Sequence, residues 1–395
     1  MKTICSLCFL FLALPSFLLA QHDSIHFVPG KMSDILAVAA REHKPIFMDA
    51  YTTWCGPCKW MEKTAYRNDT VADFYNKNFV CIKVDMEKGE GPELAKRYKV
   101  RNYPTYLFVD ASGEIMHRTC GSRPVKDFVE AGQKAMNPNE NYHFYQSSFD
   151  MGMRDASFMR GYIDAKGGAC MKTDSLLTEY FKTQAEKDLM SRDNWTMIYK
   201  YLDNVDAKEF NYFEKNYDQY TKLYTADSVD MKISNAYMTK FYTLIYDSVM
   251  SRSKYDALKN KVSAMHTPGS GKILFQADLA LASKTKDWKQ YGQLAYDNID
   301  KYYNDDAGAL NNFAWDFFTN INDSKMLEKA LEWSRRSLVL DESAGTKDTE
   351  ANLLNKLGRK QEAIAAEEKA IDLAQKEKGA VDSFKETLEQ FKKGK

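Results

Sequence analysis

The residues best suited to chemistry in this sequence are Cys55 and Cys58, which lie two residues apart in the hexapeptide WCGPCK at 54–59. An apolar run over 45–51 predicts a buried strand before them, and residues 59–65 predict a helix after them. Free backbone N–H groups and the helix dipole at a helix N-terminus favour a thiolate over a thiol. The second cysteine is close enough to attack a mixed disulfide formed at the first. The motif therefore predicts a dithiol/disulfide switch.

The hexapeptide resembles the active site of thioredoxins, and further positions extend the resemblance over about residues 24–137. Asp49 stands where thioredoxins carry a buried carboxylate beneath the second cysteine. Tyr103-Pro104 and the residues to 109 resemble the cis-proline loop and the strand behind it, and Gly121 takes the place of a family glycine after the next strand. The resemblance implies an α/β thioredoxin-like fold, in which helices flank a mixed central sheet.

The periodicity of the sequence agrees with such a fold. Strands are expected at 45–51, 79–85, 105–109 and 115–118, with a hairpin turn at 110–114. Helices are expected from Ser33 or Asp34 as the N-cap, and then over 59–65, 71–75, 92–98 and from 124 onward. Strands that alternate with helices predict a sheet covered on both faces.

The resemblance also implies a role for each residue of the site. Cys55 is the exposed nucleophile, Cys58 resolves the mixed disulfide, and Asp49, with a raised pKa, exchanges a proton with the Cys58 thiol. Pro104 holds a cis peptide that lets a substrate strand pair beside the cysteines. The alternatives are an ordinary polar residue at 49 and a trans turn proline at 104. The expected substrate-binding residues are Trp54, Gly56, Pro57, Tyr103, Pro104, Cys120 and Gly121.

Three more cysteines remain once residues 1–20 are set aside as a signal peptide: Cys81, Cys120 and Cys170. An odd, sparse set does not indicate a scaffold stapled by disulfides. Cys120 is either a third redox thiol or a small apolar residue of a half-buried strand. Cys81 is expected to be inert in the core. Cys170 is expected in a loop over 165–171, where an exposed thiol is either a liability or a partner in an intermolecular bond.

Composition excludes several functions. The basic residues (Lys plus Arg) and the acidic residues (Asp plus Glu) number 55 each. The chain therefore has no positive net charge that would favour binding to nucleic acid. The six histidines form no cluster, a second cysteine pair for zinc is missing, and no histidine follows the CxxC as in a haem attachment site. No metal and no cofactor are therefore expected.

Residues 1–20 have the charged start, apolar run and small closing residue of a secretory signal, with cleavage expected before Gln21. No other stretch is apolar and long enough to span a membrane. A secreted chain with this cysteine pair is expected in a bacterial periplasm, where it needs an electron partner.

Beyond the thioredoxin-like domain, expected over 21–137, residues 137–141 predict a linker and the remainder predicts helices. A helical domain is expected over 138–269. Over 270–395, Ala330 and Ser337 recur 33 residues later as Ala363 and Ala370, which resembles tetratricopeptide repeats. An earlier unit is expected to contribute a helix over 287–303.

Together these features predict an envelope thiol–disulfide oxidoreductase that acts on cysteine-containing secreted proteins and is recharged by a thiol protein. Gly56-Pro57 favours a reductase or isomerase over an oxidase. The alternative is a redox-linked adaptor or chaperone, in which the helical part binds a partner and turnover is minor. The sequence leaves the substrate, the electron partner, the ligand of the helical part and the oligomeric state open.

Overall fold

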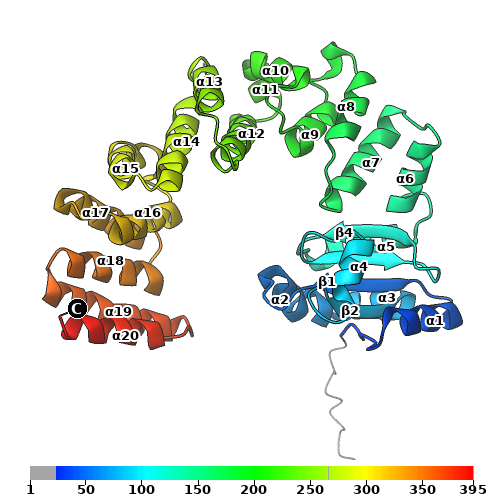
Figure 1. The fold of residues 1–395 in the computed structure, drawn as a ribbon, viewed down its shortest axis with the longest axis horizontal. Coiled ribbons are helices and arrows are strands. Elements are labelled where there is room, and N and C mark those ends of the chain that lie inside the picture. The colour runs from blue at the N-terminus through cyan, green and yellow to red at the C-terminus, as the bar shows by residue number, and fades with distance from the viewer. Residues whose placement is uncertain (1–23, 266, 395) are drawn as a thin grey trace, which may run out of the picture. The chain divides into compact units, whose positions relative to one another are not determined.

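The computed structural model describes residues 24–265 and 267–394, and the chain divides into two compact units (Figure 1). One unit ends at Tyr201 and the other begins at Leu202. The expected signal segment at 1–20 lies outside the described residues. The expected boundaries at 137/138 and 269/270 stay predictions.

The first unit is built on a four-stranded mixed sheet of order β2-β1-β3-β4. β1 is parallel to β2 and antiparallel to β3, and β3 is antiparallel to β4. The C-terminal ends of β1, β2 and β4 therefore lie at the same end of the sheet as the N-terminal end of β3. The strands are β1 Ile46–Tyr51, β2 Val80–Asp85, β3 Thr105–Val109 and β4 Ile115–Cys120.

Alternate side chains of β1 enter two separate apolar clusters because successive side chains of a strand point to opposite faces. Ile46 and Met48 pack with residues of α1 and α4, whereas Phe47 packs among aromatic rings that include Tyr75 of α3 and Phe128 of α5. Helices thus cover both faces of the sheet, as predicted. They are α1 Met32–Glu42, α2 Gly56–Lys63, α3 Asp69–Asn78, α4 Gly91–Arg97 and α5 Val125–Met136, with a 3-10 turn at Ala65–Arg67.

The strands and helices predicted for this region are all present, but the predicted start of the first helix is wrong. α1 begins at Met32, and its N-cap, Lys31, makes no side-chain capping bond. The hydroxyl of Ser33 instead donates a hydrogen bond to the carboxylate of Asp34, at 3.4 Å. Both residues lie inside the first turn, so neither serves as the cap.

Helices that follow the expected linker pack onto the same sheet. α6 and α7 contact the edge strand β4, and Nδ1 of the buried His117 accepts the Tyr142 N–H at 3.1 Å. Burial lowers the pKa of His117 to about 3, so this side chain stays neutral and can accept that bond. Covering the edge removes an open row of strand hydrogen-bonding groups. The helices are α6 Tyr142–Asp150, α7 Ala156–Gly168, α8 Asp174–Lys182 and α9 Arg192–Tyr201, with a 3-10 turn at Glu186–Asp188.

The second unit consists of helices, and no strand occurs anywhere in 142–265 or 267–394. The helical prediction for this part of the chain is therefore confirmed. The helices are α10 Lys208–Lys215, α11 Tyr217–Leu223, α12 Ala226–Ile245, α13 Arg252–Ser263, α14 Ser270–Thr285, α15 Trp288–Tyr303, α16 Ala307–Asn320, α17 Ser324–Leu340, α18 Ala344–Lys356, α19 Lys360–Lys376 and α20 Asp382–Lys392.

The expected repeat positions are buried on two helices, although they lie at different distances from the helix starts. Ala330 and Ser337 are buried on α17, and Ala363 and Ala370 are buried on α19. Small side chains at such positions let neighbouring helices approach closely. The assignment to tetratricopeptide repeats stays a prediction. Within the described ranges, no helix is both long and apolar enough to cross a membrane.

Candidate active site

Cys55 and Cys58 form a disulfide at the junction between β1 and α2. Cys55 is the N-cap of α2, and its sulfur accepts the Cys58 N–H at 3.1 Å. This places Cys55 where free N–H groups and the helix dipole stabilise a thiolate. The sequence-based expectation that Cys55 is exposed is wrong for this oxidised form. Cys55 is 3% exposed and Cys58 is 2% exposed.

Asp49 lies on β1, on the sheet face that carries the aromatic cluster, and is 1% exposed. Burial raises its pKa to about 6, and the charge of Lys83 only partly opposes this shift. Its Oδ1 atom has no hydrogen-bond partner among the described residues. The raised pKa therefore agrees with the expectation for a carboxylate that exchanges a proton near neutral pH.

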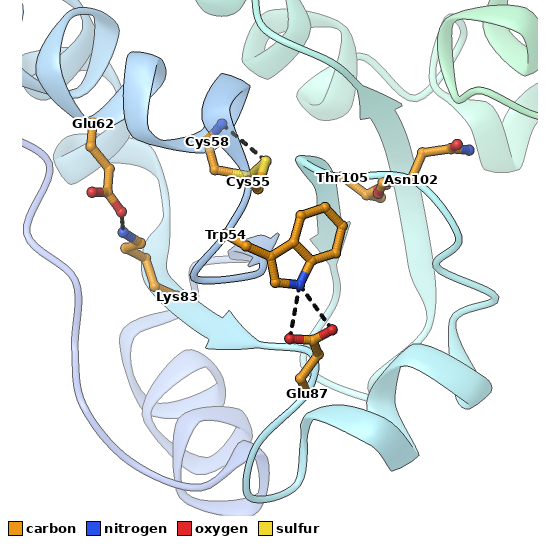
Figure 2. Close-up of a disulfide and its surroundings, with 8 residues drawn as sticks. All are labelled: Trp54, Cys55, Cys58, Glu62, Lys83, Glu87, Asn102 and Thr105. Atoms are coloured by element: carbon orange, nitrogen blue, oxygen red, sulfur yellow. Dashed lines mark hydrogen bonds and ion pairs between the residues drawn. A yellow bond between two sulfur atoms is a disulfide. The ribbon is translucent and has the colours of Figure 1, made fainter. Parts of the chain in front are cut away.

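Lys83 is the positive charge that opposes the rise in the pKa of Asp49. Burial lowers the pKa of Lys83, and Asp49 acts in the opposite direction. Its ammonium group pairs with the carboxylate of Glu62 (Figure 2). The same group lies 4.6 Å from the ring centroid of Tyr51. A lysine held in this way offsets part of the cost of a charged Asp49.

The loop before β3 contains a cis peptide between Tyr103 and Pro104, as predicted. The Gly121 N–H donates to the Pro104 carbonyl at 2.9 Å, and the Thr105 hydroxyl donates to the Asn102 carbonyl at 2.7 Å. Gly121 has a φ of 81°, a conformation that favours glycine. Because β1 and β3 are antiparallel, this loop and the CxxC lie at the same end of the sheet.

Trp54 forms an exposed rim beside the disulfide. It is 64% exposed, and its indole N–H donates to the Glu87 carboxylate at 3.0 Å (Figure 2). Its ring meets that of Tyr103 edge to face, with the ring centroids 6.0 Å apart. Gly56 and Pro57 are also exposed, in the first turn of α2. Of the expected substrate-binding residues, Trp54, Gly56 and Pro57 adjoin the disulfide in the chain, and Tyr103 packs against Trp54. The roles of all seven residues in substrate binding stay predictions. Glu87 is a neighbour of Trp54 that the sequence did not suggest.

A second disulfide joins Cys120 to Cys170. Cys120 is therefore neither the free redox thiol nor the simple apolar residue that the sequence suggested. The loop expected over 165–171 is partly wrong, since α7 continues to Gly168 and the turn holding Cys170 follows it. Cys81 is a buried free thiol whose pKa is raised by burial to about 12, as expected for an inert core cysteine.

One signal in the sequence could have revealed the second disulfide. With Cys81 assigned to a central strand, four cysteines remain, and an even set in a secreted chain permits two bridges. As for metals, no cluster of histidine, cysteine or acidic residues suited to an ion occurs in the described part of the chain.

Comparison with known proteins agrees with this geometry. Residues 13–106 match the family model Thioredox_DsbH, described as a protein of unknown function, DUF255. Thioredoxin-1 of Drosophila melanogaster is 44% identical over 72 residues, which are 18% of this chain and 63% of that protein. The N-terminal domain is thioredoxin-like. The chain thus spans less than two thirds of the Drosophila thioredoxin that it matches.

Two further similarities involve the thioredoxin-like domain. The thiol:disulfide interchange protein DsbD of Vibrio vulnificus is 32% identical over 126 residues, covering 30% of this chain and 21% of that protein. The solution structure of a candidate disulphide-isomerase from Bacteroides thetaiotaomicron is 42% identical, covering 30% of this chain and 98% of that one, with a TM-score of 0.28. The sequence matches and the CxxC spacing place the thioredoxin-like domain in a family of thiol–disulfide oxidoreductases.

Proposed function

We propose that the chain is an envelope thiol–disulfide oxidoreductase that reduces or isomerises disulfides in secreted proteins. The observation that carries the proposal is the Cys55–Cys58 pair, which caps α2 at the sheet end that also holds the cis peptide of Pro104. Closing a disulfide over so short a separation stabilises a fold little, so a purely structural role is disfavoured. The exposed rim of Trp54, Gly56 and Pro57 leaves room for a partner protein at the pair.

In the reduced protein, the Cys55 thiolate attacks one sulfur of a substrate disulfide. A Cys55–substrate disulfide forms and the other substrate sulfur leaves as a thiolate, which takes a proton from solvent. Cys58 then attacks the Cys55 sulfur, giving the Cys55–Cys58 disulfide and releasing the second substrate thiolate. Two electrons pass from the CxxC to the substrate.

Asp49 supports the second step. With a pKa of about 6, its carboxylate takes the proton of Cys58 as that thiol becomes the nucleophile. The backbone of the cis-proline loop, fixed by the Gly121 to Pro104 hydrogen bond, offers a substrate strand a place to pair. These roles are part of the proposal.

The helical second unit gives the proposal its partner-binding part. The small buried residues that recur on α17 and α19 support a repeat-type stack, an architecture that presents extended surfaces to other proteins. The expected signal at 1–20 supports export and a periplasmic location. A separate thiol protein then recharges the Cys55–Cys58 pair.

The test uses insulin as a disulfide-bearing probe and dithiothreitol as the electron source. The wild-type chain should accelerate insulin reduction, and Cys58→Ser should accumulate a Cys55–insulin adduct visible by non-reducing electrophoresis. Cys55→Ser is the matched control, because it keeps one cysteine of the pair but lacks the nucleophile. Insulin reduction by Cys55→Ser at the wild-type rate, with no adduct in Cys58→Ser, contradicts the proposal and favours the adaptor alternative.

A further inference from the structure

The second disulfide lies at the same end of the sheet as the first. Cys120 ends β4 and pairs with Thr105 of β3, which in turn pairs with Ala50 of β1, shortly before Cys55. Neighbouring strands are about 4.8 Å apart, so two strand spacings, roughly 10 Å, separate β1 from β4 here. In the sheet, β3 lies between β1, which leads into the CxxC, and β4, which ends at Cys120. The cis-proline loop leads into this end of β3.

The turn that carries Cys170 contacts the cis-proline loop directly. The Asn102 side-chain amide donates to the Cys170 carbonyl at 3.4 Å, and the Thr119 hydroxyl donates to the Gly168 carbonyl at 2.9 Å. Tyr103, the residue after Asn102 in this loop, packs against Trp54, and Figure 2 draws Asn102 and Thr105 where the chain enters β3. The Cys120–Cys170 bond therefore lies beside the cis-proline loop, where a substrate strand is expected to pair.

The Cys120–Cys170 bond also has the features of an exchangeable disulfide. Cys120 is 8% exposed, whereas Cys170 is an exposed residue. Cys170 has a φ of 53°, in the left-handed region that is strained for residues other than glycine, asparagine and aspartate. Exposed or strained disulfides are the ones that are readily reduced, whereas structural disulfides resist reduction.

We propose that Cys120–Cys170 is a second redox site and that its reductant is the Cys55/Cys58 dithiol of the same chain or of a second copy. This inference rests on the proposed function. The Cys55 thiolate attacks the Cys170 sulfur, forming a Cys55–Cys170 disulfide and releasing Cys120 as a thiolate that takes up a proton. The Cys58 thiolate then attacks the Cys55 sulfur and releases Cys170. The first pair is oxidised by two electrons, and the second pair is reduced to a dithiol.

This transfer makes the chain a two-step carrier. Electrons enter at the CxxC and leave from Cys120, at the end of β4, and Cys170, in the turn between α7 and α8. Opening the bond also removes the covalent tie between that turn and β4, beside the backbone that a substrate strand would use. Cys81 takes no part, since it is buried and its thiol is held neutral by a raised pKa.

The test follows both pairs by mass spectrometry in the full-length mature chain. Fully oxidised wild type and a Cys55→Ser/Cys58→Ser variant receive the same limiting dithiothreitol, and samples are acid-quenched and alkylated at intervals. Reduction of Cys120–Cys170 should be at least tenfold faster in the wild type. Circular dichroism checks the fold of the variant, and Cys55→Ala serves as a second variant. A rate constant independent of protein concentration indicates transfer within one chain, and one proportional to concentration indicates transfer between copies.

Equal rates in wild type and variant overturn the inference, as does a Cys120–Cys170 bond that stays oxidised while Cys55–Cys58 is reduced. Insulin reduction is measured on the same wild-type sample. If insulin is reduced but Cys120–Cys170 is reduced no faster in the wild type than in the variant, the inference alone fails. If insulin is not reduced either, the proposed function fails first.

Discussion

Replacing Asp49 with asparagine should stabilise the oxidised thioredoxin-like domain at pH 8. Burial raises the pKa of Asp49 from 3.8 to about 6, so the folded state binds this proton more tightly than the unfolded state does. The stability gained from the protonated form is complete below pH 4 and is lost as the pH rises through 6. A shift of about two pKa units corresponds to roughly 3 kcal/mol, since one unit is about 1.4 kcal/mol. Asp49→Asn removes this loss because its amide never ionises.

Hydrogen exchange of peptides from β1 and β3, read by mass spectrometry, measures this effect within the domain that contains Asp49. The protection of Asp49→Asn should exceed that of the wild type by roughly 3 kcal/mol at pH 8, and the difference should shrink toward zero at pH 4. Asp73→Asn, which alters an exposed carboxylate on α3, is the control and should change little. A gain that is the same at both pH values, or no gain at pH 8, would refute the reasoning.

Two further substitutions test the physical account of the fold. Burial and the neighbouring Asp348 raise the pKa of Glu367, a fully buried residue of α19. Glu367→Gln should therefore stabilise the second unit in urea unfolding by roughly 1–3 kcal/mol at pH 9 and by little at pH 4. An equal effect at both pH values would contradict this. A Cβ at Gly91 would lie 2.0 Å from the Asp85 carbonyl oxygen, so Gly91→Ala should cost about 1–3 kcal/mol in thermal unfolding, whereas Gly345→Ala, with open space around it, should cost far less. Similar losses in the two alanine variants would show that the backbone near Gly91 adjusts freely.

The parts of the site that could be predicted are those fixed by local sequence and strand order. The hexapeptide at 54–59, the position of Asp49 on the preceding strand and the cis peptide before Pro104 each depend on residues close in sequence to a recognisable motif. Once β1 and β3 are antiparallel, these segments have to meet at one end of the sheet.

The parts that could not be predicted depend on packing between distant segments. Cys120 and Cys170 are 50 residues apart, and they meet because α7 packs on β4, which no periodicity reveals. The hydrogen bond from the Tyr142 N–H to His117 depends on the same packing. The burial of Cys55 likewise depends on the residues packed around the pair, which the motif alone does not specify.

The Cys120–Cys170 bond closes a covalent ring that contains α5, α6 and the whole of α7. A protease that cuts between Asn137 and Asn141 would therefore leave two fragments that stay joined until the disulfide is reduced. A recombinant fragment ending at residue 137 would have the opposite problem, because it keeps Cys120 but lacks Cys170 and Tyr142. Its unpaired thiol would be available for air oxidation into dimers, and β4 would regain an open edge. Redox measurements on such a fragment would report on Cys55, Cys58 and the unpaired Cys120 together, besides the buried Cys81. The fragment to express and study is therefore the one that runs through α9.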